Sequence, residues 1–320
     1  MSSAVASTTA VPVATPEIRE HLSPNQKAIR RFVRNRPAVI SAIVLIAITL
    51  LVLIWPLISP YSPIALSDAQ SEPPAAAHWF GTDVHGRDLM ARVFYGARIS
   101  LLVGVVGAAV SLVIGVLWGA VAGYMGGRWD SIMMRIVDVL YSLPSIIFVI
   151  VLITTMETML KDWLTRVFSQ ELASVARMIF LFAGLGAVSW LTMARIVRGQ
   201  VLSLKTRNFI EASRALGASE TRIILRHILP NLLGIILVYV TLTVPSIVLY
   251  ESFLSFLGLG IQPPQASLGS LIAEGAAQIN PIRVYWWMIL FPAGTLALTL
   301  LALNFMGDGL RDAFDPRERR

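Results

Sequence analysis

Six long stretches of the chain contain no charged residue, and this feature constrains the fold more than any other. They cover residues 37–59, 99–127, 139–156, 178–194, 228–250 and 284–307. A helix needs roughly 20 apolar residues to cross the hydrocarbon core of a bilayer, which is about 30 Å thick. The sequence therefore predicts an all-α integral membrane protein with six transmembrane helices. Its 56% hydrophobic and 14% charged residues are far from the composition of a soluble protein.

A seventh uncharged run, residues 252–273, is not expected to cross the membrane. It contains Gln262-Pro263-Pro264-Gln265, and two adjacent prolines would leave backbone groups unpaired in lipid. We predict a re-entrant or surface segment here.

The positions of the basic residues predict which side of the membrane each segment occupies. Lys and Arg near the ends of spans collect on the cytoplasmic side, and both ends of this chain are basic. With six spans and both termini inside, 19 of the 26 basic residues lie in cytoplasmic segments, seven of them between residues 195 and 226. Membrane topology thus explains the net charge of +7, and no nucleic-acid partner is expected.

The chain divides into four segments. Residues 1–30 lack an apolar period and are predicted to be a disordered cytoplasmic tail. Residues 31–97 would hold the first transmembrane helix and a long, proline-rich external loop. Residues 98–310 would form a five-helix membrane domain, and residues 311–320 a cytoplasmic C-terminal tail.

Residues typical of catalysis or of metal and cofactor binding are missing from the sequence. The chain has no cysteine and only four isolated histidines, His21, His78, His85 and His227. It has no phosphate-binding loop ending in Gly-Lys-Ser/Thr, because none of its three lysines follows a glycine. We predict a non-catalytic chain with no metal or cofactor site of its own.

Carboxylates that could carry a coupling proton are also missing from the predicted spans. Glu157 and Glu251 fall at outer ends, where we expect solvated helix edges rather than a proton relay. Ion-coupled carriers usually keep ionisable groups inside the membrane. The pattern therefore favours a permease powered by another protein, or a structural membrane protein, over a proton-coupled carrier.

Small residues recur at four-residue intervals in the second predicted span. They are Gly107, Ser111, Gly115, Gly119, Gly123 and Gly127. This spacing places them on one face of a helix, where a second helix can approach closely. We predict helix packing at Gly115, Gly119 and Gly123, with a second helix from this chain or from a partner.

The polar stretch 195–227 is predicted to fold into a pair of short helices on the cytoplasmic face. Asn208, followed three residues later by Glu211, is typical of a capped helix start. Phe209, Ala212 and Leu216 would form the apolar side of this first helix.

The end of the first helix and the start of the second are also predicted by single residues. Gly217 can take a positive φ and end the first helix. Ser219 can cap a second helix that runs toward Pro230 and the next span. Together the two helices would form an elbow across the cytoplasmic face.

The residues E-A-S-R-A-L-G-A at 211–218 and H-I-L-P-N at 227–231 resemble the EAA signature of permease subunits in ATP-binding-cassette (ABC) importers. The resemblance implies that the elbow is a coupling helix, which docks in a cleft of an ATPase subunit. Ser213 stands where the family pattern has a second alanine. The residues implied in coupling to the ATPase are Glu211, Ala212, Ser213, Ala215, Gly217 and Pro230.

Other segments are similar to the permeases of peptide importers, and within that group to the OppC type. They include H-W-F-G-T-D at 78–83, G-R-D at 86–88 and L-Y-E-S-F-L-S-F-L-G-L-G at 249–260. The resemblance implies the type I ABC importer permease fold, with one N-terminal helix plus a five-helix core. Residues 98–310 would then be an ABC transmembrane type-1 permease domain.

The resemblance also implies partners and a location. The partners are a second, OppB-like permease, two ABC ATPase subunits of the OppD/OppF type that bind ATP and Mg, and an extracytoplasmic peptide-binding protein. The location is the lipid bilayer of a bacterial cytoplasmic (inner) membrane. This chain would form half of the pathway for oligopeptides; dipeptides, glutathione, murein peptides and nickel are alternative substrates in the same family.

Overall fold

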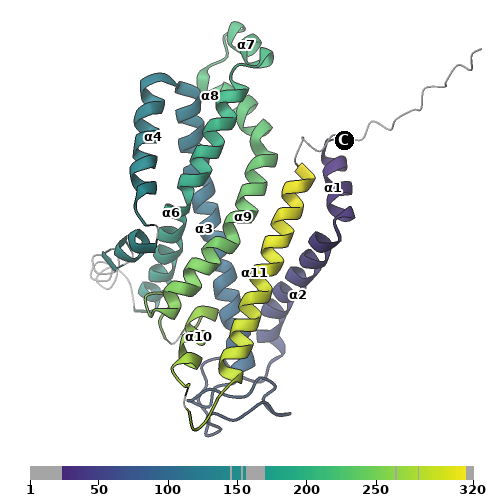
Figure 1. Cartoon of the computed structure of the whole chain (residues 1–320), viewed down its shortest axis with the longest axis vertical. Helices are drawn as coiled ribbons and strands as arrows, with labels where there is room; N and C mark the ends of the chain where they lie inside the picture. Colours follow the sequence, from purple (N-terminus) through teal and green to yellow (C-terminus); the bar gives the residue numbers. More distant parts are fainter. Residues whose placement is uncertain are drawn as a thin grey trace, which may run out of the picture.

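The computed structural model describes residues 24–144, 146–152, 154–155, 170–263, 265–279 and 281–314. Within these ranges the regular elements are helices, and the strand-like pairing is limited to one isolated bridge between Thr82 and Asp88. The long helices run alongside one another as an elongated bundle (Figure 1). The prediction of an all-α fold is therefore confirmed.

The bounds of the helices follow the apolar runs closely in most of the chain. In chain order they are α1 (Pro24–Arg34), α2 (Arg36–Ile58), α3 (Leu89–Met125), α4 (Gly127–Ser142), α6 (Gln170–Leu204), α7 (Asn208–Ala215), α8 (Glu220–Ile223), the π-helix η1 (Ile224–Ile228), α9 (Leu229–Phe256), α10 (Leu268–Ala276) and α11 (Trp287–Phe314).

Four helices in the described ranges are long and apolar enough to cross a membrane. They are α2, α3, α11 and the continuous helix Glu220–Phe256 that contains α9. The number rises to five if α4 and the short helix Ile146–Leu152 count as one broken span. α6, at 35 residues, contains the predicted run 178–194. A multi-pass membrane protein is confirmed, and the number six remains a prediction.

The predicted span over residues 139–156 is broken rather than continuous. α4 ends at Ser142, and the helix Ile146–Leu152 is bent by 96° from it. Pro144 explains the break, because the residue before a proline avoids helical angles, and Leu143 is extended with φ −79° and ψ 139°. Residue 153 and residues 156–169, including Glu157, lie outside the described part of the chain.

Each of the two predicted tails contains helical residues next to the membrane domain. Residues 1–23 lie outside the described residues, but residues 24–30, assigned to the disordered tail, are helical in α1. Ala28 is buried and Phe32 lies against Gly309 of α11, so α1 is held by packing on the last helix. Residues 311–314 are likewise helical, since α11 continues to Phe314.

The uncharged run 252–273 does not form a span. α9 continues to Phe256, and the chain then turns into α10, which has nine residues and is about 14 Å long. α10 packs on α3, α9 and α11 at the end of the bundle where the long loop between α2 and α3 lies (Figure 1).

α3 is the central helix of the bundle, and its small residues face α6. A Cβ added to Gly115 would lie 2.6 Å from Cβ of Met193, and one added to Gly119 would collide with the carbonyl oxygen of Ala194. A Cβ added to Gly123 would lie 2.8 Å from a carbonyl oxygen of α6. The helix that lies against this stripe therefore belongs to the same chain.

Glu251 corrects the prediction of a solvated helix edge. It lies inside α9 and is fully buried. Its carboxylate accepts hydrogen bonds from Ser100 of α3 (2.9 Å) and from Ser255 (2.6 Å), and Ser100 in turn accepts one from the backbone N–H of Leu268 in α10 (3.3 Å). The buried carboxylate thus joins α3, α9 and α10, and it was missed because α9 extends six residues beyond the uncharged run.

The glycine stripe yields the first testable prediction. Gly119→Ala should destabilise the bundle by about 1–3 kcal/mol, because the new methyl group has no room against α6. Gly199→Ala in α6 is the matched control, since a Cβ there meets nothing within 4 Å; it should stabilise the helix by up to about 1 kcal/mol. Thermal unfolding in detergent measures both, and equal effects would contradict the close packing of α3 on α6.

Candidate functional site

The helical elbow formed by α7 and α8 projects beyond one end of the bundle (Figure 1). The chain enters it from α6 and leaves it through η1 into α9. The described ends of α1 and α11 lie toward the same end of the molecule (Figure 1). The elbow is therefore the part of the described chain that extends farthest on that side.

Two isoleucines anchor the elbow to the bundle. Ile210 of α7 and Ile223 of α8 are completely buried. They belong to a hydrophobic cluster with Tyr124 of α3 and Val201 of α6. Arg214 adds a contact by donating a hydrogen bond of 3.4 Å to the hydroxyl of Tyr124. The elbow is thus packed on α3 and α6, the two helices that approach each other closely at the glycine stripe.

The predicted apolar side of α7 faces away from the bundle. Phe209, Ala212 and Leu216 are all exposed, Leu216 to 89% and Phe209 to 42%. Each residue of a helix turns by 100°, so once Ile210 faces the bundle, neighbouring positions must face away. Glu211 and Ala215 are exposed as well. The elbow therefore presents apolar and acidic side chains together on its surface.

The predicted start of α7 is wrong by one residue, whereas its end is confirmed. Arg207 is the N-cap, and no side-chain capping bond is made there, so Asn208 and Glu211 do not form a capping box. Gly217 has φ +79°, a left-handed conformation that glycine adopts without steric cost. Ser219 caps α8 by accepting a hydrogen bond from the N–H of Arg222 at 3.4 Å.

Pro230 lies in the first turn of α9, directly after η1. A proline has no N–H, so the carbonyl four residues earlier loses its partner, and a wider turn accommodates the change. In η1 the N–H of Leu229 bonds to the carbonyl of Ile224, five residues back. Asn231 also donates to the carbonyl of His227 at 2.6 Å. Pro230 therefore shapes the exit of the elbow into α9.

Ion pairs fasten α4 to α6 on the same side of the molecule. Arg198 binds Asp130 with two nitrogen atoms, one at 2.6 Å, and Arg195 binds Asp138 at 2.8 Å. Lys205 donates to the carbonyl of Gly123 in α3 at 3.0 Å. Apart from the shared helix face of Arg195 and Arg198, no sequence pattern predicts these pairs, because each joins residues more than fifty positions apart.

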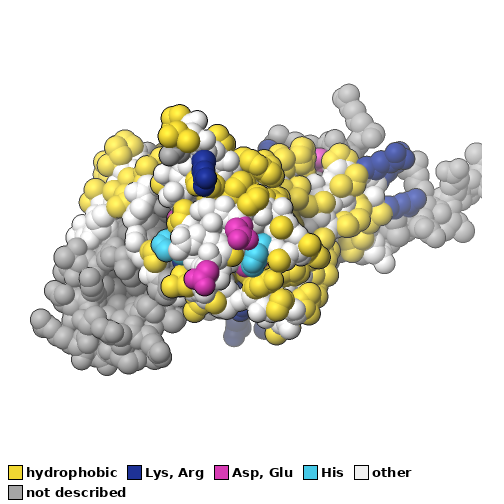
Figure 2. Space-filling model, turned by 90° about the horizontal axis from the view of Figure 1, so that it is seen from below, with side chains coloured by type: hydrophobic (Ala, Val, Ile, Leu, Met, Phe, Trp, Pro, Cys, Tyr) yellow, Lys and Arg dark blue, Asp and Glu magenta, His cyan; other side chains and the backbone are white. Residues whose placement is uncertain are grey.

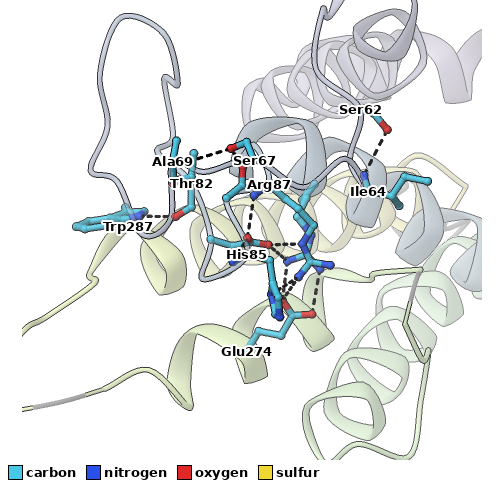
Figure 3. A network of polar contacts seen from close by, with 12 residues as sticks. Ser62, Ile64, Ser67, Ala69, Thr82, His85, Arg87, Glu274 and Trp287 are labelled. Carbon is cyan, nitrogen blue, oxygen red and sulfur yellow. Dashed lines mark hydrogen bonds and ion pairs between the residues drawn. The ribbon is translucent and has the colours of Figure 1, made fainter.

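A second polar site lies at the opposite end of the bundle, where the loop between α2 and α3 is folded over α10 (Figure 3). Asp83 is almost completely buried and accepts hydrogen bonds from Arg87 and Arg92, each at 2.6 Å. Arg92 also binds Glu274 of α10 at 2.6 and 3.0 Å. The buried charge network thus holds the loop on the bundle.

Further contacts order the same loop. Asp88 caps α3 by accepting from the N–H of Ala91 at 2.7 Å and binds His78 at 2.8 Å. Trp287 of α11 donates to the carbonyl of Thr82 at 3.2 Å. Figure 2, which views this end of the molecule, shows acidic and histidine side chains close together, with a basic side chain nearby. This folded loop, residues 59–88, is called the outer platform below.

No group of His, Cys, Asp and Glu that could hold a metal ion exists among the described residues. The polar clusters at the two ends of the bundle consist instead of ion pairs between acidic and basic side chains. Their arrangement is suited to holding helices and loops in place.

Two family models match the chain. Residues 115–320 match the "Binding-protein-dependent transport system inner membrane component" family. Residues 23–74 match the "N-terminal TM domain of oligopeptide transport permease C".

Similar proteins cover nearly the whole chain. The oligopeptide transport system permease protein OppC of Escherichia coli (strain K12) is 50% identical over 297 residues, which is 92% of this chain and 91% of that protein. The dipeptide transport system permease protein DppC of Bacillus subtilis (strain 168) is 45% identical over 303 residues, 94% of this chain and 88% of that protein.

The fold is also similar to a solved structure. One chain of a structure titled "Inward facing conformations of the MetNI methionine ABC transporter" has a TM-score of 0.53 at 22% identity. The match covers 70% of this chain and 97% of that chain.

The buried network of the outer platform yields a prediction. Asp83→Asn should destabilise the protein by about 3 kcal/mol, because it leaves the buried guanidinium of Arg92 with one carboxylate fewer. Asp68→Asn, at an exposed position of the same loop, should change stability by less than about 0.5 kcal/mol. Unfolding measured by tryptophan fluorescence distinguishes them, and a similar loss for both variants would contradict the network's role.

The same carboxylate predicts a loss of stability in acid. Burial raises the pKa of the Asp83 carboxyl, but the backbone N–H groups of Arg87 and His85 and the charges of the two arginines outweigh it and hold the pKa below its ordinary value of 3.8. The stabilisation is therefore present above pH 3.8 and is lost as the pH falls through the lower folded-state pKa. Between pH 5 and pH 2 the free energy of unfolding should fall more steeply with decreasing pH for the unmodified chain than for Asp83→Asn. Identical pH dependence in the two proteins would refute the assignment.

Proposed function

The chain belongs to the family of binding-protein-dependent transport system inner membrane components, and from this we propose that it is the permease subunit of an ATP-driven importer of oligopeptides. Its similarity to oligopeptide permeases along 92% of its length supports this substrate class. The similarity to a dipeptide permease makes dipeptides the main alternative. The chain forms half of the translocation pathway, and a second, OppB-like permease forms the other half.

The observation that carries the proposal is the exposed surface of α7. Leu216, the residue that caps the C-terminal end of α7, is 89% exposed, and Glu211 of α7 is exposed as well, whereas the other side of the elbow is packed on the bundle. An apolar side chain so exposed on a rigid helix is suited to insertion in a pocket of another protein. We assign this surface to a cleft of an ATPase subunit, with Ala212, Ser213 and Ala215 allowing close approach.

Gly217 and Pro230 have a different part in the same proposal. Gly217 supplies the left-handed turn that folds α8 back toward the bundle, and Pro230 forms the exit into α9. Both residues fix the shape of the elbow. The docking contacts themselves come from α7.

The packing of the elbow suggests how movement reaches the pathway. Ile210 and Ile223 join it to α3 and α6, and the pairs Arg198–Asp130 and Arg195–Asp138 join α6 to α4. A displacement of α7 by closing ATPase subunits therefore moves these helices together. The ATPase subunits, of the OppD/OppF type, bind ATP and Mg and hydrolyse the ATP; this chain contributes no catalytic group.

The remaining parts of the proposal concern topology. Six transmembrane helices, including α6 and the broken pair after Gly127, give both termini and the elbow a cytoplasmic location. The outer platform then faces the other side of the inner membrane, where an extracytoplasmic peptide-binding protein delivers the substrate. The ordered, ion-paired loop is a stable surface for such an encounter.

Substitution of the exposed leucine tests the proposal. Leu216→Asp should abolish ATP-dependent peptide uptake and the copurification of ATPase subunits, because a carboxylate cannot enter an apolar pocket without a large desolvation cost. Leu66→Asp is the matched control: it is 71% exposed, lies on the outer platform and should leave ATPase binding unchanged. Glu211→Lys combined with Gly217→Pro should likewise stop transport while the chain still inserts.

Two results would contradict the proposed function. Unchanged uptake by Leu216→Asp would show that α7 does not couple ATP hydrolysis to transport. Uptake that survives depletion of ATP but stops when the proton gradient is removed would identify a proton-coupled carrier instead.

A further inference from the structure

A groove of about 400 Å³ lies between α4, α6 and α9. This volume falls within the range of about 300–1,000 Å³ that is typical of sites for small ligands. Of the described residues that line it, seven carry a hydroxyl group and none carries a charge. The groove belongs neither to the elbow nor to the outer platform.

The hydroxyl groups follow a helical stripe. On α9 they belong to Tyr239, Thr243, Ser246 and Tyr250, spaced by four, three and four residues, which places them on one face. α9 is part of a helix long and apolar enough to span the membrane. Polar side chains at membrane depth face the interior of a bundle or a water-filled cavity rather than lipid. The stripe therefore marks the side of α9 that faces the bundle interior or a water-filled cavity.

The hydrogen bonds within the groove leave a defined set of groups available. Ser189 of α6 donates to the carbonyl of Leu185 at 3.0 Å, and Thr243 donates to that of Tyr239 at 2.7 Å. Each hydroxyl oxygen keeps lone pairs that can accept from a ligand N–H. The phenolic groups of Tyr239 and Tyr250 make no hydrogen bond to other described residues, so they can donate to a ligand carbonyl. The groove can thus bind both polar groups of a peptide bond.

Charge is confined to one margin of the groove. The guanidinium of Arg195 lies 4.1 Å from the ring centre of Tyr141, which lines the groove, and it is paired with Asp138 at 2.8 Å. The pair is neutral as a unit. The lining itself therefore offers no ion pair that would select for or against a charged side chain.

We propose that this groove is the substrate-facing wall of the pathway and that it binds the backbone amides of peptides through neutral hydroxyl groups, without regard to side-chain charge. The proposal rests on the proposed function, which supplies the peptide. Hydrogen bonds to amide groups common to all peptides give weak, sequence-independent binding, which lets a transported molecule leave as readily as it enters.

The absence of cysteine from the chain allows a direct test. Ser246→Cys in the groove is compared with Leu237→Cys, an exposed position on the opposite side of α9. Both are studied in the assembled transporter with a cationic, membrane-impermeant thiol reagent, and label is counted on this chain alone. Labelling at position 246 should be about tenfold faster than at position 237, because a thiol must be hydrated to ionise and react. A transported peptide should slow labelling at position 246 severalfold and leave position 237 unchanged.

A second readout uses the labelled transporter. Cationic and anionic reagents attached at position 246 should shift the ratio of uptake of lysine-containing to glutamate-containing peptides in opposite directions. The unlabelled Ser246→Cys variant is the reference for both ratios. Equal ratios with both labels would overturn the proposal.

The remaining outcomes separate this proposal from the proposed function. Labelling that is no faster at position 246 than at position 237, or that ignores peptide, overturns the groove as the substrate-facing wall while ATP-dependent uptake still stands. If the unsubstituted assembly takes up no peptide with ATP, the proposed function fails, and the groove proposal fails with it.

Discussion

The close packing of α3 on α6 is the contact on which the rest of the structure depends. It is possible only because Gly115, Gly119 and Gly123 have no side chain where the backbone of α6 passes. α6 continues directly into the elbow, and it binds α4 through two arginines. The elbow, α3, α4 and α6 are therefore joined into one unit that can transmit a movement applied at its exposed surface.

The opposite end of the bundle is held by polar rather than by steric contacts. Glu251 joins α9 to α3 and α10, and Asp83 with Arg92 and Glu274 joins the outer platform to α3 and α10. Each cluster places a buried acidic side chain among groups that hydrogen-bond it, and removing one partner is costly. α10 is thus fixed from two sides. The hydroxyl-lined groove lies between α4, α6 and α9. α6 and α9 lead directly into and out of the elbow.

The sequence predicted best what depends on neighbouring residues. The charge-free runs gave the positions of α2, α3, α9 and α11, and Gly217 and Ser219 gave the turn of the elbow. The predictions failed where contacts between residues far apart in the sequence decide which side chains are buried. Ile210 faces inward because Tyr124 and Val201 are there to receive it, and Glu251 is buried because Ser100 comes from another helix. No local sequence pattern shows which residues of other helices will receive these side chains. For the same reason the sequence could not show which helix packs against the glycine stripe.

If the proposed coupling holds, the elbow and α3 move as one unit when ATP binds to the ATPase subunits. Spin labels at two exposed positions, Ala215 on α7 and Val113 on α3, would measure this in the cysteine-free chain within the assembled transporter. We expect the distance between the two labels to stay the same with and without ATP. A change of about 5 Å, the rise of one helical turn, would contradict it, because α7 would then move independently of the helix that the glycines hold.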